Sequence, residues 1–245
     1  MKRLLRLDEI RGITLVSMIL YHGTWDLVHL FGWDLPWYRL LPGYVWQQSI
    51  CWTFILLSGF CWSLGHHRYK RGVTVFAAGA LVTAVTCFVM PASRVVFGVL
   101  TLLGSCMLLC IPFRKLLEKC PSVPGGAVSF SLFLFLRNVN RGSLGFEKWR
   151  LLPLPEKWYH SPATAYLGFP PEEFFSTDYF SLIPWMFLFL TGYYLYRFCL
   201  EKGQLIHLEG GKLPLMQWLG RHSLILYLLH QPMLYLLLYL LVGSG

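Results

Sequence analysis

Three ionisable residues lie at helical spacing within the first apolar segment of the chain, residues 10–31: Arg11, His22 and Asp26. At 100° per residue, an offset of eleven returns His22 to within about 20° of the face of Arg11, roughly 16 Å further along a helix. Asp26 follows His22 by four residues, an offset at which side chains meet on one helix face. We therefore predict that Asp26 hydrogen-bonds His22 and fixes its tautomer, with His22 acting as a general base.

Each of these residues has a structural alternative. His22 could be a buried histidine that a neighbouring helix satisfies, but an ionisable residue at membrane depth costs several kcal/mol without a partner or a function. We therefore favour a functional role for it. Arg11 has two interpretations that the sequence leaves open. It is either an anchor for a phosphate-bearing ligand, because guanidinium binds phosphate bidentately, or a topology-setting arginine paired with Asp8.

The last apolar segment carries a second polar group: Arg221, His222, His230, Gln231 and Pro232, in LGRHSLILYLLHQP. His222 and His230 are eight residues apart and share a helix face. We predict that His230 and Gln231 line the same polar cavity as His22, and that Pro232 kinks the helix and opens carbonyl groups near His230. Arg221 and His222 are candidates for donor binding, and an interfacial position is the alternative for His222.

Asp178 and the cysteines have mainly structural interpretations. Asp178 precedes the sixth apolar segment, and we predict that it caps that helix, with the outer mouth of the cavity as the alternative. The seven cysteines lie in apolar segments or predicted cytoplasmic loops, without a CxxC motif. We interpret them as packing residues and expect no metal site.

The composition indicates a polytopic membrane protein. Of 245 residues, 56% are hydrophobic and only 13% are charged, about half the charge of a typical soluble domain. We predict an all-α transmembrane bundle that forms a single domain over residues 1–245, with an N-terminal segment that is not a cleaved signal peptide. Hydropathy predicts about seven spans, or eight as the alternative: 10–31, 43–64, 72–91, 95–112, 126–137, 178–199 and 215–241. The fifth is short, and every later side assignment is reversed if it does not cross.

We attribute the net charge of +9 mostly to basic residues that set the orientation of the chain in the membrane. With a cytoplasmic N-terminus, Lys2, Arg3, Arg6 and the basic turn after His66 fall on the inner side, as the positive-inside rule requires. We therefore expect no nucleic-acid partner. The loop 138–177 is the exception, because it keeps four basic residues outside. Its prolines, glycines and aromatic residues predict a folded lid at the outer membrane interface.

Five motifs carry a resemblance to a known family, in this order along nearly the whole chain: LDEIRGITLVSMILYHGTWDL, FILLSGFCWSL, VVFGVLTLLG, STDYFSLIPWMFLFLTGYYLYR and LGRHSLILYLLHQPML. The chain resembles a bacterial member of the heparan-alpha-glucosaminide N-acetyltransferase catalytic-domain family. That family belongs to the transmembrane acyltransferases, whose acyltransferase-3 branch shares a signature of Arg, ten residues and His. Arg11 and His22 reproduce this spacing.

The resemblance implies transfer of an acetyl group from cytosolic acetyl-CoA to an amine or hydroxyl, on a carbohydrate or glycolipid acceptor beyond a bacterial plasma membrane. It makes His22 the catalytic residue, with Asp26 beside it and Arg11 near the CoA end, and an oligomer is compatible with it. The chain departs from the family pattern in two features that concern the acceptor: Thr101 stands where family members often carry histidine, and the chain is short.

Two other classes of function use the same residues. His22, His222 and His230 on apolar helices are typical of axial ligands in a haem-binding electron carrier. An intramembrane His–Asp pair is also typical of a proton-coupled transporter, although the sequence has no internal repeat.

Overall fold

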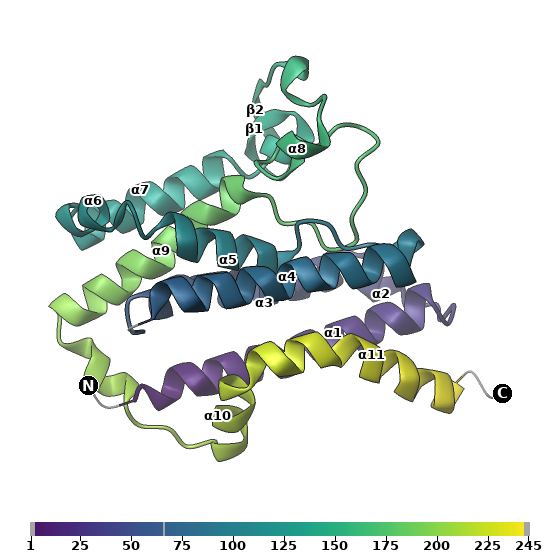
Figure 1. Ribbon diagram of the computed structural model, residues 1–245, viewed down its shortest axis with the longest axis horizontal. Coiled ribbons are helices and arrows are strands. Elements are labelled where there is room, and N and C mark those ends of the chain that lie inside the picture. The colour runs from purple at the N-terminus through teal and green to yellow at the C-terminus, as the bar shows by residue number, and fades with distance from the viewer. Residues whose placement is uncertain (1–2, 66, 243–245) are drawn as a thin grey trace. The chain divides into compact units, whose positions relative to one another are not determined.

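The computed structural model describes residues 3–65 and 67–242, so Lys2 and His66, which were predicted to lie on the cytoplasmic side, fall outside the described residues. Within the described ranges the chain forms eleven α-helices and one two-stranded sheet (Figure 1). Its contacts divide it into two compact units, residues 1–54 with 202–245 and residues 55–201. The single domain that the sequence predicts stays a prediction.

The first unit combines the two ends of the chain. It holds α1 (Leu5–His29), α2 (Pro36–Arg39), the beginning of α3 (Leu41–Trp62), the 3-10 helix η4 (Gln204–Leu208), α10 (Pro214–Arg221) and α11 (Ser223–Val242). In Figure 1 the purple α1 and the yellow α11 lie side by side, and both α10 and α11 contact α1. Residues some 200 positions apart in the sequence therefore share one small core.

Two glycines allow α1 and α10 to approach backbone to backbone. A Cβ atom added to Gly12 would lie 2.0 Å from the carbonyl oxygen of Met216, and one added to Gly220 would lie 2.0 Å from that of Asp8. Any side chain at either glycine would therefore force the helices apart. On another side of α1, the Trp46 indole of α3 donates a hydrogen bond to the Ser17 hydroxyl (2.8 Å). These contacts hold α1 against α3 and α10.

The second unit is built from α4 (Arg68–Val89), α5 (Val99–Leu109), α6 (Arg114–Lys119), α7 (Ser122–Phe135), α9 (Leu182–Glu201) and the end of α3. Within it α4 packs on α5, and α9 packs on α5 and α7. Glycines again set the closest approaches, because a Cβ at Gly59 of α3 would lie 1.9 Å from the carbonyl oxygen of Phe189 in α9.

The aromatic loop 138–177 is folded, as predicted. It contains β1 (Ser143–Phe146), β2 (Trp149–Pro153) and α8 (Pro162–Ala165), besides the 3-10 helices η2 (Val139–Arg141) and η3 (Glu156–Trp158). The strands pair antiparallel, and the buried Asn138 amide donates to the carbonyl oxygens of Glu147 and Trp149, both at 3.1 Å. The all-α prediction missed this hairpin, because strands of four and five residues are too short to show a clear alternation.

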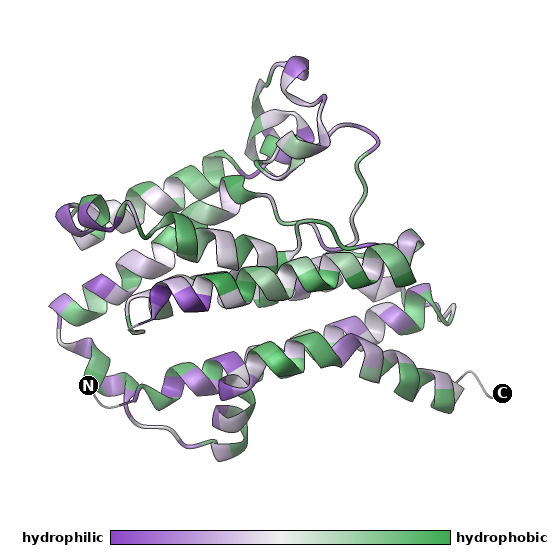
Figure 2. Cartoon of the chain, viewed as in Figure 1, coloured by the Kyte–Doolittle hydropathy of each residue, from purple (hydrophilic) through white to green (hydrophobic). Residues whose placement is uncertain are grey.

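The predicted spans correspond to helices with two corrections. The last one, 215–241, is two helices, because the chain breaks at His222 between α10 and α11. By length and apolar composition, two helices of the described chain are able to cross a membrane, Arg68–Val89 and Ser223–Leu241, and Figure 2 shows hydrophobic residues along both. The second correction concerns α5 and α7, which have 11 and 14 residues. Helices of this length are shorter than the hydrocarbon core of a bilayer, which is about 30 Å thick.

Candidate functional site

The first helix places both candidate groups. α1 begins at Leu5 with Asp8 in its first turn, where a carboxylate faces the positive end of the helix dipole. It ends after His29, where Gly32 adopts a positive φ of 71° that favours glycine. Arg11 and His22 therefore lie in one continuous helix, eleven residues apart, as the sequence predicts.

The partner of His22 is a second histidine. The Nδ1 atom of His22 lies 2.7 Å from Nε2 of His230 on α11, and the two rings meet edge to edge, with their centroids 4.8 Å apart and an interplanar angle of 23°. The other ring nitrogen of His230, Nδ1, hydrogen-bonds the carbonyl oxygen of Tyr227 one turn earlier in α11. His230 is buried, whereas His22 is half-buried. Two imidazoles from opposite ends of the sequence thus form one hydrogen-bonded chain.

The predicted hydrogen bond between Asp26 and His22 is wrong. The Asp26 carboxylate instead accepts a hydrogen bond at Oδ1 from Nε2 of Gln231 (2.7 Å), and its Oδ2 is buried without a partner among the described residues. The i, i+4 offset allows contact on one helix but does not require it, and side chains from α11 reach both residues. The structure does bring His22, Asp26, His230 and Gln231 together within the first unit.

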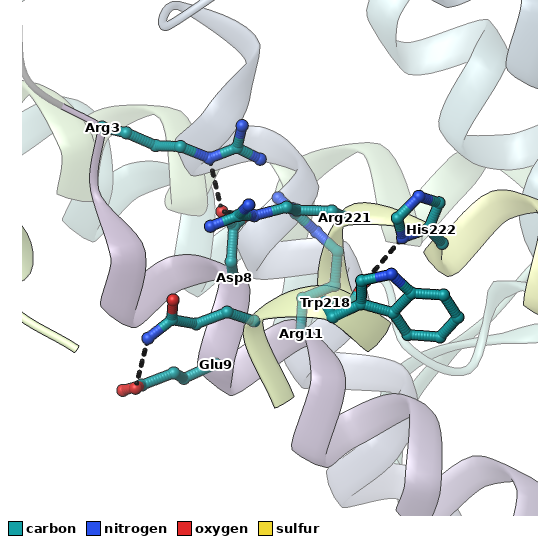
Figure 3. A network of polar contacts seen from close by, with 8 residues as sticks. Arg3, Asp8, Glu9, Arg11, Trp218, Arg221 and His222 are labelled. Carbon is teal, nitrogen blue, oxygen red and sulfur yellow. Dashed lines mark hydrogen bonds and ion pairs between the residues drawn. The ribbon is translucent and has the colours of Figure 1, made fainter. Parts of the chain in front are cut away.

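At the start of α1, three arginines surround one buried carboxylate. Asp8 accepts from Nε of Arg3 at 2.7 Å and from Arg11 at 3.1 Å, and Nε of Arg221 lies 3.7 Å away (Figure 3). The pairing of Arg11 with Asp8, one of the two interpretations left open, is confirmed. Arg221 arrives from α10 because Gly12 and Gly220 let that helix approach. The sequence alone did not select Arg3, whose only signal was its place five residues before Asp8.

His222 closes the end of α10 beside this cluster. Its ring lies 4.6 Å from that of Trp218, and its Nδ1 hydrogen-bonds the Trp218 carbonyl oxygen at 2.8 Å (Figure 3). His222 and Arg221 are both exposed, so both are accessible to a ligand.

Glu9 fixes the other end of α10. Its carboxylate accepts from the backbone N–H groups of Lys212 and Leu213 (2.6 Å for Leu213) and from the side chain of Gln217 (3.0 Å). These hydrogen bonds, that of Leu213 first, lower the pKa of Glu9. Sequence reasoning missed this role, since Glu9 is 203 and 204 residues from the two N–H groups that it satisfies.

Tyr21 of α1 packs against Tyr38 of α2, with ring centroids 5.1 Å apart. Burial raises the pKa of the Tyr38 phenol, and the neighbouring Tyr21 and the charge of Asp26 raise it further. Tyr38 is thus a neutral hydroxyl close to the buried Asp26.

The remaining predicted residues, Thr101 and Asp178, lie together in the second unit. Thr101 is buried in the first turn of α5. Asp178 does cap a helix, but not the one that follows it. Its Oδ2 accepts from the backbone N–H of Val99 at 3.3 Å, so it caps α5. The correction has a simple cause: α9 begins four residues later, at Leu182, and the first turn of α5 lies within reach.

Metal ligation has no candidate among the described residues, which hold no cluster of three or more His, Cys, Asp or Glu side chains able to bind an ion. The seven cysteines, all described, are free thiols.

A helical chain with apolar surface helices, a paired imidazole and a cluster of arginines around the start of the same helix has the features of a membrane-embedded transferase. The family model of heparan-alpha-glucosaminide N-acetyltransferase, catalytic, matches residues 3–232. The chain belongs to this family and is therefore an acetyltransferase of a membrane family that uses acetyl-CoA as donor. Searches of curated proteins and of solved structures found no match.

Proposed function

We propose that the protein moves an acetyl group from cytosolic acetyl-CoA to an amine or hydroxyl of a carbohydrate or glycolipid acceptor on the outer side of a bacterial plasma membrane. The proposal includes a topology of about seven membrane spans with a cytoplasmic N-terminus. One observation carries it: α1 holds Asp8, the centre of the arginine cluster, and Arg11 near its start, and His22 follows Arg11 by eleven residues on the same helix. Family membership favours this enzyme over a haem-binding carrier or a transporter.

The arginine cluster is the proposed anchor for the phosphates of CoA, through Arg11, Arg221 and His222, with Arg3 added. Three arginines against the single carboxylate of Asp8 leave the cluster with a positive charge. Phosphate groups fit this charge, and guanidinium binds them bidentately.

The spacing along α1 fits the shape of the donor. Eleven residues of helix cover about 16 Å, a distance suited to an extended pantetheine arm between its phosphates and its thioester. CoA itself is too polar to cross the bilayer, so only the acyl end of the arm would reach His22. The acetyl group would then meet an acceptor that arrives from the opposite side.

His22 is the proposed reacting residue, in one of two routes. As a general base it takes the proton from the acceptor N–H or O–H, while the acceptor atom attacks the thioester carbonyl and the C–S bond breaks. As a relay, it attacks the thioester itself, forms an acyl-imidazole and passes the acetyl group to the acceptor. In both routes the thiolate of CoA leaves, and the proton that balances its charge is the one that the acceptor N–H or O–H loses.

Asp26 belongs to the acceptor end of this proposal. Its carboxylate is fully buried in the last turn of α1, where the helix dipole disfavours a negative charge, and it forms no ion pair with any described residue. The partnerless Oδ2 is placed to accept a hydrogen bond from an acceptor amine or hydroxyl. His230 and Gln231 line this end of α1 within the first unit. The roles expected of Thr101, Asp178 and the loop 138–177 stay predictions.

The test measures release of the CoA thiol by the full chain in nanodiscs, supplied with acetyl-CoA and a cell-envelope glycan extract. We expect acceptor-dependent release by the wild type and its loss in His22→Gln. His29→Gln is the matched control, because His29 is an exposed histidine of the same helix. Wild-type turnover in His22→Gln would remove His22 from the mechanism.

A further inference from the structure

The hydrogen bonds of His230 determine where the hydrogens of the histidine pair lie. A carbonyl oxygen only accepts hydrogen bonds, so the bond from His230 Nδ1 to the Tyr227 carbonyl requires a hydrogen on Nδ1. A neutral imidazole has one hydrogen, which leaves Nε2 of His230 with a lone pair. That atom lies 2.7 Å from Nδ1 of His22, which must then be the donor.

The same reasoning fixes the second nitrogen of His22. With its hydrogen on Nδ1, neutral His22 carries the lone pair on Nε2, and among the described residues His22 hydrogen-bonds only through Nδ1. We propose that His230 is a positioning residue, which holds His22 in the Nδ1–H tautomer and leaves Nε2 as the reacting nitrogen. This inference rests on the proposed function of His22 and gives His230 the role first expected of Asp26.

The arrangement serves both routes of acetyl transfer. If His22 is the base, Nε2 takes the acceptor proton, and the resulting imidazolium keeps its Nδ1–H bond to the lone pair of His230, which becomes charge-assisted and stronger. If His22 is the relay, Nε2 attacks the thioester carbonyl and the C–S bond breaks. The other tautomer would place a hydrogen on Nε2 and block either step.

The backbone of α11 supports this role. His230 is buried and hydrogen-bonded through both ring nitrogens, so its ring has little freedom. Pro232 follows two residues later, within α11; it offers no N–H to the carbonyl of Leu228 and crowds it, one residue after Tyr227. The Tyr227 carbonyl in this region serves as the fixed acceptor for the chain of imidazoles.

Two substitutions separate positioning from packing. His230→Gln places Oε1 the same number of bonds from Cβ as the imidazole Nε2, so it keeps an acceptor for His22 Nδ1–H. His230→Phe keeps a buried aromatic ring without an acceptor. We expect kcat to fall by about 100-fold or more in His230→Phe and by less than about 10-fold in His230→Gln, with the KM for acetyl-CoA unchanged in both.

A readout independent of turnover is the tautomer of His22, measured by ¹⁵N NMR on histidine-labelled protein and assigned by comparison with His22→Gln. We expect the hydrogen on Nδ1 in the wild type and in His230→Gln, and a mixture of tautomers in His230→Phe. A hydrogen on Nε2 in the wild type would overturn the inference, as would equal activity of the two variants. Neither result would touch the proposed function, which fails only if His22→Gln stays active.

Discussion

A methyl group at Gly12 should weaken donor binding without touching any donor-binding side chain. The Cβ of Gly12→Ala would lie 2.0 Å from the carbonyl oxygen of Met216, whereas an ordinary contact is at least 3.4 Å. α1 and α10 must therefore move apart by about 1.4 Å, the difference between the two. Arg221, now 3.7 Å from Asp8, would leave ion-pair range.

The expected magnitudes follow from this displacement. Overpacking lowers the free energy of unfolding by about 1–3 kcal/mol. The higher helix propensity of alanine offsets up to about 1 kcal/mol of this loss. Losing one hydrogen bond to a charged donor group costs about 1.5 kcal/mol or more, so the KM for acetyl-CoA should rise at least about tenfold. The kcat should change less, since His22 and His230 lie further along α1 and on α11.

Gly23→Ala is the matched control in the same helix. Its Cβ would meet Leu234 at 3.6 Å, an ordinary contact, so this variant gains helix propensity without a clash. Thermal unfolding in detergent and the KM for acetyl-CoA, measured on both variants, decide the matter. If Gly12→Ala matches Gly23→Ala in both measurements, the close approach of α1 and α10 does not build the donor site.

Two further substitutions test the ends of α1. Asp26→Asn keeps an oxygen for Gln231 but replaces the second carboxylate oxygen, which has no partner among the described residues, by an NH2 group. The kcat/KM for the acetyl acceptor should therefore fall about 10- to 100-fold, with the KM for acetyl-CoA unchanged. A changed KM for acetyl-CoA would contradict a place for Asp26 at the acceptor end. Glu9 has a lowered pKa in the folded protein, so its stabilisation is present above pH about 4.5 and is lost as the pH falls through the lowered value. The melting temperature of Glu9→Gln should therefore be below wild type at pH 7 and approach it in acid, and a constant difference across this range would contradict the role of Glu9.

Local spacing predicted the features that depend on one helix. Arg11 and His22 share α1 because eleven residues are close to three turns, and Asp8 meets Arg11 at an offset of three residues. The folded state of the loop 138–177 was also predictable, because disordered segments are poor in aromatic residues. Composition and motif order were enough to identify the family that the model match then showed.

Local spacing could not predict which residues pair when they are far apart in the sequence. His22 pairs with His230, 208 residues away, and Glu9 caps a helix that starts 205 residues later. Spacing shows which residues are able to meet on one helix, but not which residue from another helix comes closer.

The sequence by itself therefore determined a helical membrane acetyltransferase with Arg11 and His22 on one helix. The tertiary structure decided that His230 and not Asp26 is bonded to His22, that Arg3 and Arg221 join Arg11 at Asp8, and that Asp178 caps α5. The physical reason is that helix packing, set here by the glycine contacts of α1 and α10, brings distant side chains within hydrogen-bond range.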